Sequence, residues 1–279
     1  MTDPTVFRTD RVLNDSSRLP AIGQGSARST DPGEAMVSAL RLGYRLLDTA
    51  SAYGTEATVP RAIAASGVPR GDVTVMTKLR GRDQGYGSAL RAAAESRERL
   101  GGDPIDVYLI HWPMPAVDRY VETWRAMIEL RAAGVVRTIG VSNFTADQLR
   151  RLGDETGTLP AVNQIELHPI FPQPELRAFH EAHGIQTVAY SPLARGGEVL
   201  ESAVIVRIAA RLGITPAQVI VRWHRQHGVV PILGSGNPVR QRLGLEVWDF
   251  VLSESDMAAI DSAFDPRRLG GDPLTREEL

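Results

Sequence analysis

Short apolar segments alternate with longer amphipathic segments along nearly the whole chain, and this alternation constrains the fold more than any other feature. Short segments that are apolar throughout are typical of strands buried on both faces, and the amphipathic segments carry the period of helices. Repeated strand–helix units build a parallel sheet. About eight such units fit an α/β fold of the closed (β/α)8, or TIM, barrel class. The expected strands are Pro20–Gly25, Arg45–Thr49, Val73–Lys78, Ile105–Ile110, Val136–Val141, Val162–Leu167, Gln186–Ser191 and Val229–Leu233.

Capping residues mark several of the expected helices. Asp31 is an expected N-cap, Pro32 follows it at the first helical position, and Gly43 ends the same helix. Thr145 is the expected N-cap of another helix, and Pro60 must lie within the first turns of its own. The expected helices are Asp31–Leu42, Thr55–Ser66, Tyr86–Leu100, Tyr120–Ala133, Thr145–Leu152, Pro174–His183, Ala203–Leu212, Pro216–His227, Val239–Gly244 and Glu254–Phe264.

The N-terminal segment does not fit the alternation. We expect Val6–Leu13 to pair with residues near Arg18 as a short hairpin that caps the barrel floor. The 279 residues suit one α/β barrel, which typically uses about 250, and no linker or repeat of fixed period interrupts them. Residues 1–279 are therefore expected to form a single barrel domain, and a monomer.

The composition excludes several classes of function. A net charge of −2 gives no basic excess for a dedicated nucleic-acid binder. No apolar run reaches the roughly 18 residues of a membrane span, so no membrane partner is expected. Cysteine is absent, which removes disulfides, thiolate nucleophiles and cysteine-ligated metals. The first ten residues contain no apolar secretory segment, which favours a cytoplasmic location.

Lys78 is the only lysine in the sequence. A GC-rich genome that replaces lysine by arginine wherever only charge matters would explain the scarcity, and Lys78 could be a chance survivor. Arginine stays charged, however, whereas a buried lysine can shift its pKa. A lysine retained in such a chain is therefore a candidate for specific chemistry.

Polar side chains follow the expected strands at the edge where barrels of this class carry their chemistry. Asp48, Lys78 and His111 stand at the ends of three consecutive strands, and Tyr53 follows Asp48. Lys78 needs an anion, which Asp48 can supply, and its ammonium lowers the pKa of a neighbouring phenol. Tyr53 could then donate a proton to a developing alkoxide while His111 orients the carbonyl. Such a site has no hydride source of its own and requires a cofactor.

Five separated motifs carry a family resemblance. They are Asp48-Thr-Ala-Ser-Ala-Tyr53-Gly, Met76-Thr-Lys78-Leu, Leu109-Ile-His111-Trp-Pro, Gly140-Val-Ser-Asn143-Phe and Asn163-Gln-Ile-Glu166. In this order they resemble the aldo-keto reductases, above all the short bacterial members that reduce small carbonyl and diketo compounds. The resemblance implies a (β/α)8 barrel, NADPH-dependent carbonyl reduction and a catalytic tetrad of Asp48, Tyr53, Lys78 and His111, with Tyr53 as the acid. Arg268-Leu-Gly-Gly-Asp-Pro resembles the family's C-terminal tail, which puts residues 265–279 near the substrate pocket.

The same resemblance implies the cofactor contacts, which include Asp48. Ser142, Asn143 and Gln164 match the residues that hold the nicotinamide carboxamide. Tyr190 matches the ring that stacks on nicotinamide, and Ser26 matches a residue at the nicotinamide end. The expected phosphate contacts are Ser191 and Leu193 and, in the loop and helix start after the last strand, Gly234, Ser235, Gly236 and Arg240.

Departures from the family pattern concern specificity. Gly234 stands where many relatives carry a lysine for the 2′-phosphate of NADPH, which leaves Arg240 as the main cation there. NADPH is the expected cofactor, and NADH is possible. Ala27 and Arg80 replace two common pocket aromatics, while Trp112 is retained. A pocket for a small-molecule carbonyl substrate lined by these three residues should be wider and more polar than usual.

Two other functions fit some of these residues. A regulatory barrel could bind a nucleotide with little catalysis, although the intact tetrad argues against it. A barrel lyase or isomerase could use Lys78 as a Schiff base, which borohydride trapping would reveal. No metal is expected, because His180 and His183 on one helix have no evident third ligand, and solvated histidines explain them more simply.

Overall fold

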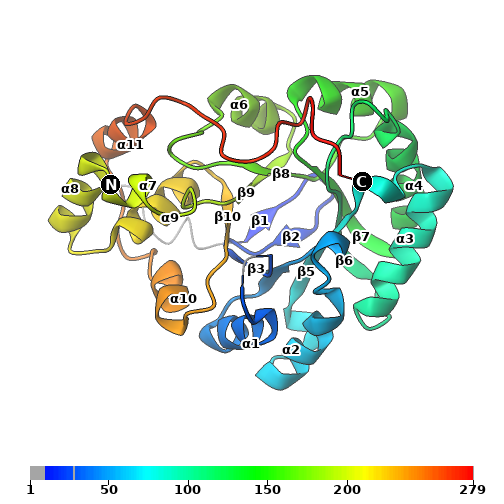
Figure 1. Ribbon diagram of the computed structural model, residues 1–279, viewed down its shortest axis with the longest axis horizontal. Helices are drawn as coiled ribbons and strands as arrows, with labels where there is room; N and C mark the ends of the chain where they lie inside the picture. The colour runs from blue at the N-terminus through cyan, green and yellow to red at the C-terminus, as the bar shows by residue number, and fades with distance from the viewer. Residues whose placement is uncertain (1–9, 28, 279) are drawn as a thin grey trace.

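Eight parallel strands close into a barrel with helices around it (Figure 1). The structure, a computed structural model, describes residues 10–27 and 29–278. The strand order around the barrel is β10-β3-β4-β5-β6-β7-β8-β9, which confirms the (β/α)8 class. The strands are β3 (Gly23–Gly25), β4 (Leu46–Asp48), β5 (Thr74–Leu79), β6 (Ile105–Ile110), β7 (Val136–Ser142), β8 (Val162–Glu166), β9 (Gln186–Tyr190) and β10 (Val230–Leu233).

A short antiparallel hairpin precedes the barrel. Strand β1 (Arg11–Val12) pairs with β2 (Arg18–Leu19), and Arg11 lies opposite Leu19. The expected hairpin is therefore present within the described residues, while residues 6–9 of its first expected segment lie outside them. Leu19 is fully buried and packs with residues of the barrel interior, so the hairpin closes that end of the core.

Helices follow the strands as the sequence pattern predicts. Asp31 caps the first of them by accepting a hydrogen bond from the N–H of Glu34, and Gly43 ends it in the left-handed conformation at φ 115°. The helices are α1 (Pro32–Leu42), α2 (Val59–Ser66), α3 (Tyr86–Arg99), α4 (Tyr120–Ala132), α5 (Ala146–Thr156), α6 (Pro174–Ala182), α7 (Glu198–Glu201), α8 (Ala203–Leu212), α9 (Pro216–Gln226), α10 (Pro238–Leu245) and α11 (Glu254–Asp261), with the single-turn helices η2 (Ser51–Tyr53), η3 (Glu56–Thr58), η4 (Arg70–Asp72) and η5 (Gly81–Asp83).

Several helices differ from the sequence prediction. Helix α11 ends at Asp261 rather than at Phe264, and α7 was not expected. Helix α5 continues a turn beyond Leu152 and ends only at Gly157, which adopts φ 68°. Gly153 does not stop it, because that glycine packs against Leu159, where an added Cβ would lie 3.1 Å from the leucine side chain. The expected helix Thr55–Ser66 divides into η3 and α2, and Pro60 lies in the first turn of α2, where its missing N–H costs nothing.

The core has two layers, one inside the barrel and one between the strands and the helices. Met76, Val107 and Ile232 belong to the inner layer. Gly140 on β7 has no room for a side chain, because an added Cβ would lie 2.7 Å from the backbone oxygen of Val162. Within the described ranges, no single helix is long and apolar enough to cross a membrane. The pair α8 and α9, bent by 94°, passes that test only when taken together.

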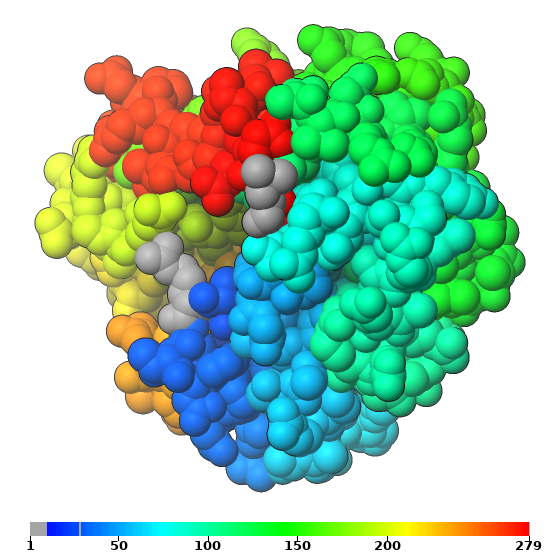
Figure 2. Space-filling view, turned by 45° about the vertical axis from the view of Figure 1, so that its right-hand side comes forward, coloured from blue at the N-terminus to red at the C-terminus, as the bar shows by residue number. Residues whose placement is uncertain are grey.

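The segment after α11 crosses the edge of the barrel at which the strands end. It runs from α11 over the barrel toward α4, and its surface lies against that of the central part of the chain (Figures 1 and 2). The N–H groups of Leu269 and Gly270 donate to the Glu166 carboxylate at 2.8 and 2.9 Å. Farther along, Gly81 donates its N–H to Glu278 at 2.9 Å. We refer to residues 265–278 as the tail.

Candidate active site

Three neighbouring strands bring the four expected catalytic residues together. Asp48 ends β4, Tyr53 lies in η2 just beyond it, Lys78 is on β5, and His111 follows β6. Asp48 pairs in register with Met76, and Lys78 with Leu109, so the carboxyl ends of the three strands are level. The predicted cluster therefore forms at the carboxyl edge of a barrel, where such folds carry their active sites.

Asp48 and Lys78 form a buried ion pair. The ammonium of Lys78 donates to Oδ1 of Asp48 at 2.6 Å and to the backbone oxygen of Thr49 at 2.9 Å, and it has no exposed surface. Gln164 on β8 donates its amide N–H to the same Oδ1 at 3.1 Å. Burial lowers the pKa of Lys78, but its interactions with Asp48 and Tyr53 outweigh this effect, and the net direction is upward. Lys78 is therefore a cation at neutral pH.

Tyr53 lies between the lysine and the histidine. The Lys78 ammonium is 5.1 Å from the centre of its ring, and its hydroxyl is 3.5 Å from Nε2 of His111. Burial raises the pKa of Tyr53, Lys78 lowers it, and the net direction is upward. Lys78 therefore lowers the pKa of Tyr53, as expected. The expectation of a net lowering is wrong, because burial raises the pKa of the phenol by more than Lys78 lowers it. Tyr53 holds its proton at neutral pH, which is the state that a general acid needs.

His111 has a carboxylate neighbour that no sequence pattern indicated. Its Nδ1 lies 2.8 Å from Oε1 of Glu278, in the tail. Burial lowers the pKa of His111, Glu278 opposes this, and the net direction is downward. The pair joins residues 167 positions apart, where 278 − 111 = 167, and no local spacing rule predicts a contact over that separation.

The expected nicotinamide-binding residues form one hydrogen-bonded group. Ser142 donates its hydroxyl to the backbone oxygen of Gln164 at 2.8 Å, and Asn143 donates to the backbone oxygen of His111 at 3.0 Å. The hydroxyl of Tyr190 donates to Oδ1 of Asn143 at 2.9 Å. Asn143 and Ser191 adopt positive φ of 65° and 50°, a costly conformation for non-glycine residues that often marks functional loops.

The loop after β10 is more open. Asn237 caps α10 by accepting hydrogen bonds from the N–H groups of Val239 and Arg240 at 2.9 and 3.2 Å. Arg240 donates to the hydroxyl of Ser235 at 3.0 Å and has much exposed surface. Among the described residues, no atom lies within 4 Å of the position that a Cβ on Gly234 would occupy. The loop therefore has space beside Gly234, a helix N-terminus and a cation, which suits a phosphate group.

The remaining expected cofactor and substrate residues lie around the same edge. The Ser26 hydroxyl is 2.9 Å from that of Thr55, and Leu193 is partly buried. Trp112 is 9% exposed, and the Arg276 guanidinium lies 5.8 Å from the centre of its ring. Ala27 is exposed, whereas Arg80 lines a cavity of about 250 Å³ beside η2 and η3.

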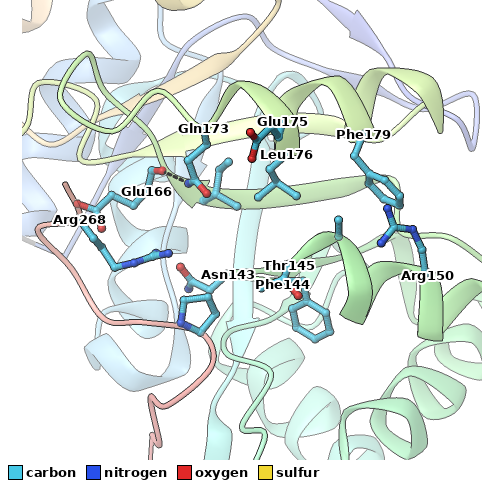
Figure 3. A pocket seen from close by; sticks show the side chains of 13 residues that line it. Asn143, Phe144, Thr145, Arg150, Glu166, Gln173, Glu175, Leu176, Phe179 and Arg268 are labelled. Atoms are coloured by element: carbon cyan, nitrogen blue, oxygen red, sulfur yellow. Dashed lines mark hydrogen bonds between the residues drawn. The ribbon is translucent and has the colours of Figure 1, made fainter. Parts of the chain in front are cut away.

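A second cavity of about 310 Å³ lies on the other side of Asn143. Asn143 comes from the β7–α5 loop and Glu166 from the end of β8, and the tail residue Arg268 extends into the space between them (Figure 3). The Arg268 guanidinium also lies 4.6 Å from the centre of the Phe171 ring. The tail thus forms part of the wall of this cavity.

The two helical histidines do not form a metal site. His180 is fully buried, is 3.0 Å from the amide of Asn163 and 2.8 Å from the hydroxyl of Thr187, and burial lowers its pKa to about 3. The expectation of a solvated residue is wrong for His180, because it bridges α6 to β8 and β9. His183 is exposed, as expected. No group of three or more metal-ligating side chains occurs among residues 10–27 and 29–278.

A parallel barrel with a buried Asp–Lys pair, a phenol and a histidine at its carboxyl edge suits an oxidoreductase that protonates a carbonyl oxygen and takes its hydride from a bound cofactor. The sequence matches the aldo/keto reductase family over residues 21–265, and the chain belongs to this family.

Relatives and solved structures agree with this assignment. The chain is 48% identical to 2,5-diketo-D-gluconic acid reductase B of Corynebacterium sp. (strain SHS752001), over 96% of this chain and 97% of that one. The crystal structure of Gox0644 in its apo form superposes with a TM-score of 0.92 at 43% identity, covering 97% and 99% of the two chains. A Gox0644 mutant in complex with NADPH gives a TM-score of 0.91 at 43% identity over the same shares.

Proposed function

We propose that Asp48, Tyr53, Lys78 and His111 reduce a small carbonyl compound and that Tyr53 is the general acid. The observation that carries this proposal is the contact chain from Asp48 through Lys78 and Tyr53 to His111, which is complete within the protein itself. Asp48, Lys78 and His111 are buried and Tyr53 is half-buried, so the charges of this chain act largely through protein rather than bulk water. A general acid in such a setting contributes roughly 10² to 10⁴-fold to the rate.

The residues present fit a nicotinamide dinucleotide. The amides of Asn143 and Gln164 supply donors and acceptors for a carboxamide, and the half-buried ring of Tyr190 offers a flat face beside them. Ser191 and Leu193 are proposed pyrophosphate contacts, with Ser26 at the nicotinamide end. Gly234, Ser235, Gly236 and Arg240 would hold the phosphate on the adenosine, supported by the open space and the cation beside that loop. When bound, NADPH supplies the hydride.

Three side chains of the proposed tetrad have separate roles in the reaction. Tyr53 donates its proton to the oxygen that becomes the alcohol. Lys78, fixed by Asp48, stabilises the phenolate left on Tyr53. His111 directs the carbonyl oxygen toward the phenol. The Schiff-base alternative is less compatible with the buried ion pair, because a cationic amine bonded to two oxygens is a poor nucleophile.

The substrate is proposed to be a polar aldehyde, ketone or dicarbonyl compound. The Arg276 guanidinium lies 5.8 Å from the centre of the Trp112 ring, Arg80 lines the cavity beside η2 and η3, and the chain lacks two aromatic side chains common in the family. The relative of 48% identity is a reductase of a diketo acid, which agrees with such a substrate. Proximity of the tail to Trp112 and His111 supports a substrate pocket covered by residues 265–278. We further propose a cytoplasmic monomer.

The proposal is tested by following the oxidation of NADPH and NADH against α-dicarbonyls, sugars and aromatic aldehydes. We expect turnover with polar dicarbonyls and a modest preference for NADPH. A protein that binds both nucleotides but oxidises neither with any of the three classes would instead support the regulatory barrel. Borohydride trapping on Lys78 with a carbonyl compound alone would support the Schiff-base enzyme.

A further inference from the structure

The carboxylate of Glu278 is held against the histidine of the proposed tetrad. Its Oε1 is 2.8 Å from Nδ1 of His111, and its Oε2 accepts the backbone N–H of Gly81 at 2.9 Å. Only 12% of the Glu278 side chain and 10% of the His111 side chain are exposed. The backbone N–H of Glu278 in turn lies 2.8 Å from the sulfur of Met114. The carboxylate is therefore positioned from three sides.

The short distance favours a proton on Nδ1 of His111. A carboxylate oxygen and an unprotonated ring nitrogen 2.8 Å apart would repel each other through their lone pairs. Burial raises the pKa of Glu278, but His111 and the Gly81 N–H outweigh it and the net direction is downward. Glu278 is thus a carboxylate at neutral pH, and a proton on Nδ1 of His111 removes the repulsion.

Neither contact of the His111 ring, with Glu278 or with Tyr53, has the geometry of a good hydrogen bond. The Nδ1–H bond is not aligned with the carboxylate oxygen, and the distance from Nε2 to the Tyr53 hydroxyl is long at 3.5 Å. Catalytic hydrogen bonds are often loose in empty sites and tighten when the substrate binds. We propose that Glu278 is a positioning residue that keeps the proton on Nδ1 of His111 and stabilises the imidazolium. The neutral ring then accepts from Tyr53 through Nε2, and only the imidazolium donates to the carbonyl oxygen.

Other charged groups around His111 do not replace Glu278. Lys78 on β5 disfavours a second proton on the ring, and Asp48 on β4 favours it from farther away, while Tyr53 in η2 is neutral. Glu278 is the largest influence that favours the imidazolium, and the charge of Arg80 acts on Glu278. Removing the Glu278 charge should therefore change the His111 titration more than any other change in the tail.

The inference rests on the role proposed for His111, and its test has a readout independent of turnover. Ring nitrogens of ¹⁵N-histidine-labelled protein are followed by NMR across pH, and His111→Asn identifies the His111 signals. We expect the neutral ring of the parent to carry its proton on Nδ1. Glu278→Gln should lower the pKa of His111 by about one unit. The alkaline limb of kcat/KM should move down by the same amount, about tenfold in rate on that limb, while KM for NADPH stays the same.

Two further variants distinguish the effect of the Glu278 charge from a change in the conformation of the tail. Glu277→Gln is the matched control, because Glu277 accepts the N–H of Ala116 at 3.1 Å and does not contact the ring. It should leave the titration unchanged. Gly81→Ala leaves both ionisable groups intact, but its Cβ would lie 2.3 Å from the backbone oxygen of Glu278 and must displace the tail. It should lower the pKa of His111 as Glu278→Gln does.

A neutral His111 protonated on Nε2 in the parent protein, or a titration that Glu278→Gln leaves in place, would overturn the inference. Failure of the proposed function looks different. If His111→Asn retains full carbonyl reduction, the catalytic assignment of His111 is wrong even where the NMR titration shows the Glu278 effect.

Discussion

The two halves of the carboxyl edge are built differently. At β4 to β6 the ionisable groups already have protein partners, as in the 2.6 Å pair of Lys78 and Asp48 and the 2.8 Å pair of His111 and Glu278. After β10, Arg240 is exposed, its side chain donates to the neutral hydroxyl of Ser235, and no atom of the residues that the structure describes fills the space beside Gly234. The first region is organised before any ligand arrives, and the second depends on the ligand for its charge balance. Substitutions should therefore change the rate in the first region and the choice of nucleotide in the second.

The largest effect is expected from Tyr53→Phe in the first region. The change removes the proposed acid but little packing, so carbonyl reduction should fall by roughly 10²-fold or more. Nucleotide binding, followed by fluorescence titration, should stay nearly intact. Tyr86→Phe on the exposed face of α3 is the matched control. Turnover near that of the parent in Tyr53→Phe would rule out the assignment of the acid.

Lys78→Arg should be nearly as damaging although it preserves the charge. The guanidinium is a planar fork on a longer side chain, and it cannot occupy the space of an ammonium that is bonded to both Asp48 and the Thr49 backbone. We expect a loss of turnover within a few fold of that in Tyr53→Phe, measured by steady-state kinetics at saturating NADPH. An arginine variant that reduces aldehydes at full rate would show that only the charge matters at this position.

Substitutions in the loop after β10 should change the relative affinities for NADPH and NADH. One charge-assisted contact is worth about 1.5–3 kcal/mol, or roughly 10- to 150-fold in affinity. Arg240→Ala should therefore bring NADPH and NADH binding close together, and Gly234→Lys should strengthen NADPH binding with little change for NADH. Fluorescence titration of both nucleotides measures this. A parent protein that prefers NADH, or an Arg240→Ala variant that keeps strong NADPH selectivity, would show that the 2′-phosphate site is elsewhere.

The smallest effect is expected at Glu166, which anchors the tail. Glu166→Gln replaces a carboxylate that accepts two backbone N–H groups and contacts His168, and should cost about 1–3 kcal/mol of unfolding free energy. Glu175→Gln on exposed α6 is the control. Burial raises the pKa of Glu166, but His168 and the tail N–H groups outweigh it, so the folded pKa is low.

This low pKa gives the Glu166 prediction a pH signature. The stabilisation is complete above about pH 4.3, the ordinary value for glutamate, and is lost as the pH falls through the folded pKa. Urea unfolding at pH 7 and at successively lower pH should show the difference between parent and Glu166→Gln shrinking. A difference that is constant down to pH 3 would mean that the Glu166 charge does not hold the tail.

The strands and the tetrad were predictable because their signals are local. Each buried strand reads as a continuous apolar run, and the barrel topology then brings Asp48, Lys78 and His111 to one edge. The expected stop at Leu152 was wrong because Gly153 lies inside the helix, and the Leu159 contact that favours a small residue there is tertiary.

Long-range partners were not predictable in the same way. Glu278 follows an irregular segment with no periodicity, and its contact with His111 exists only because the tail crosses the barrel. His180 was mistaken for a solvated residue because its buried partners, Asn163 and Thr187, lie on two other elements. The direction of the Tyr53 pKa depended on how deeply the phenol is buried, which no spacing in the sequence reveals.

Because Lys78 is buried, proteolytic cleavage at this residue reports on the opening of the barrel. A protease that cuts only after lysine has a single target in the chain, and that side chain has no exposed surface. Cleavage then requires β5 to leave the barrel, so the rate of appearance of two fragments reports how often the barrel opens. Nucleotides that bind only the closed barrel should slow that cleavage in proportion to their occupancy.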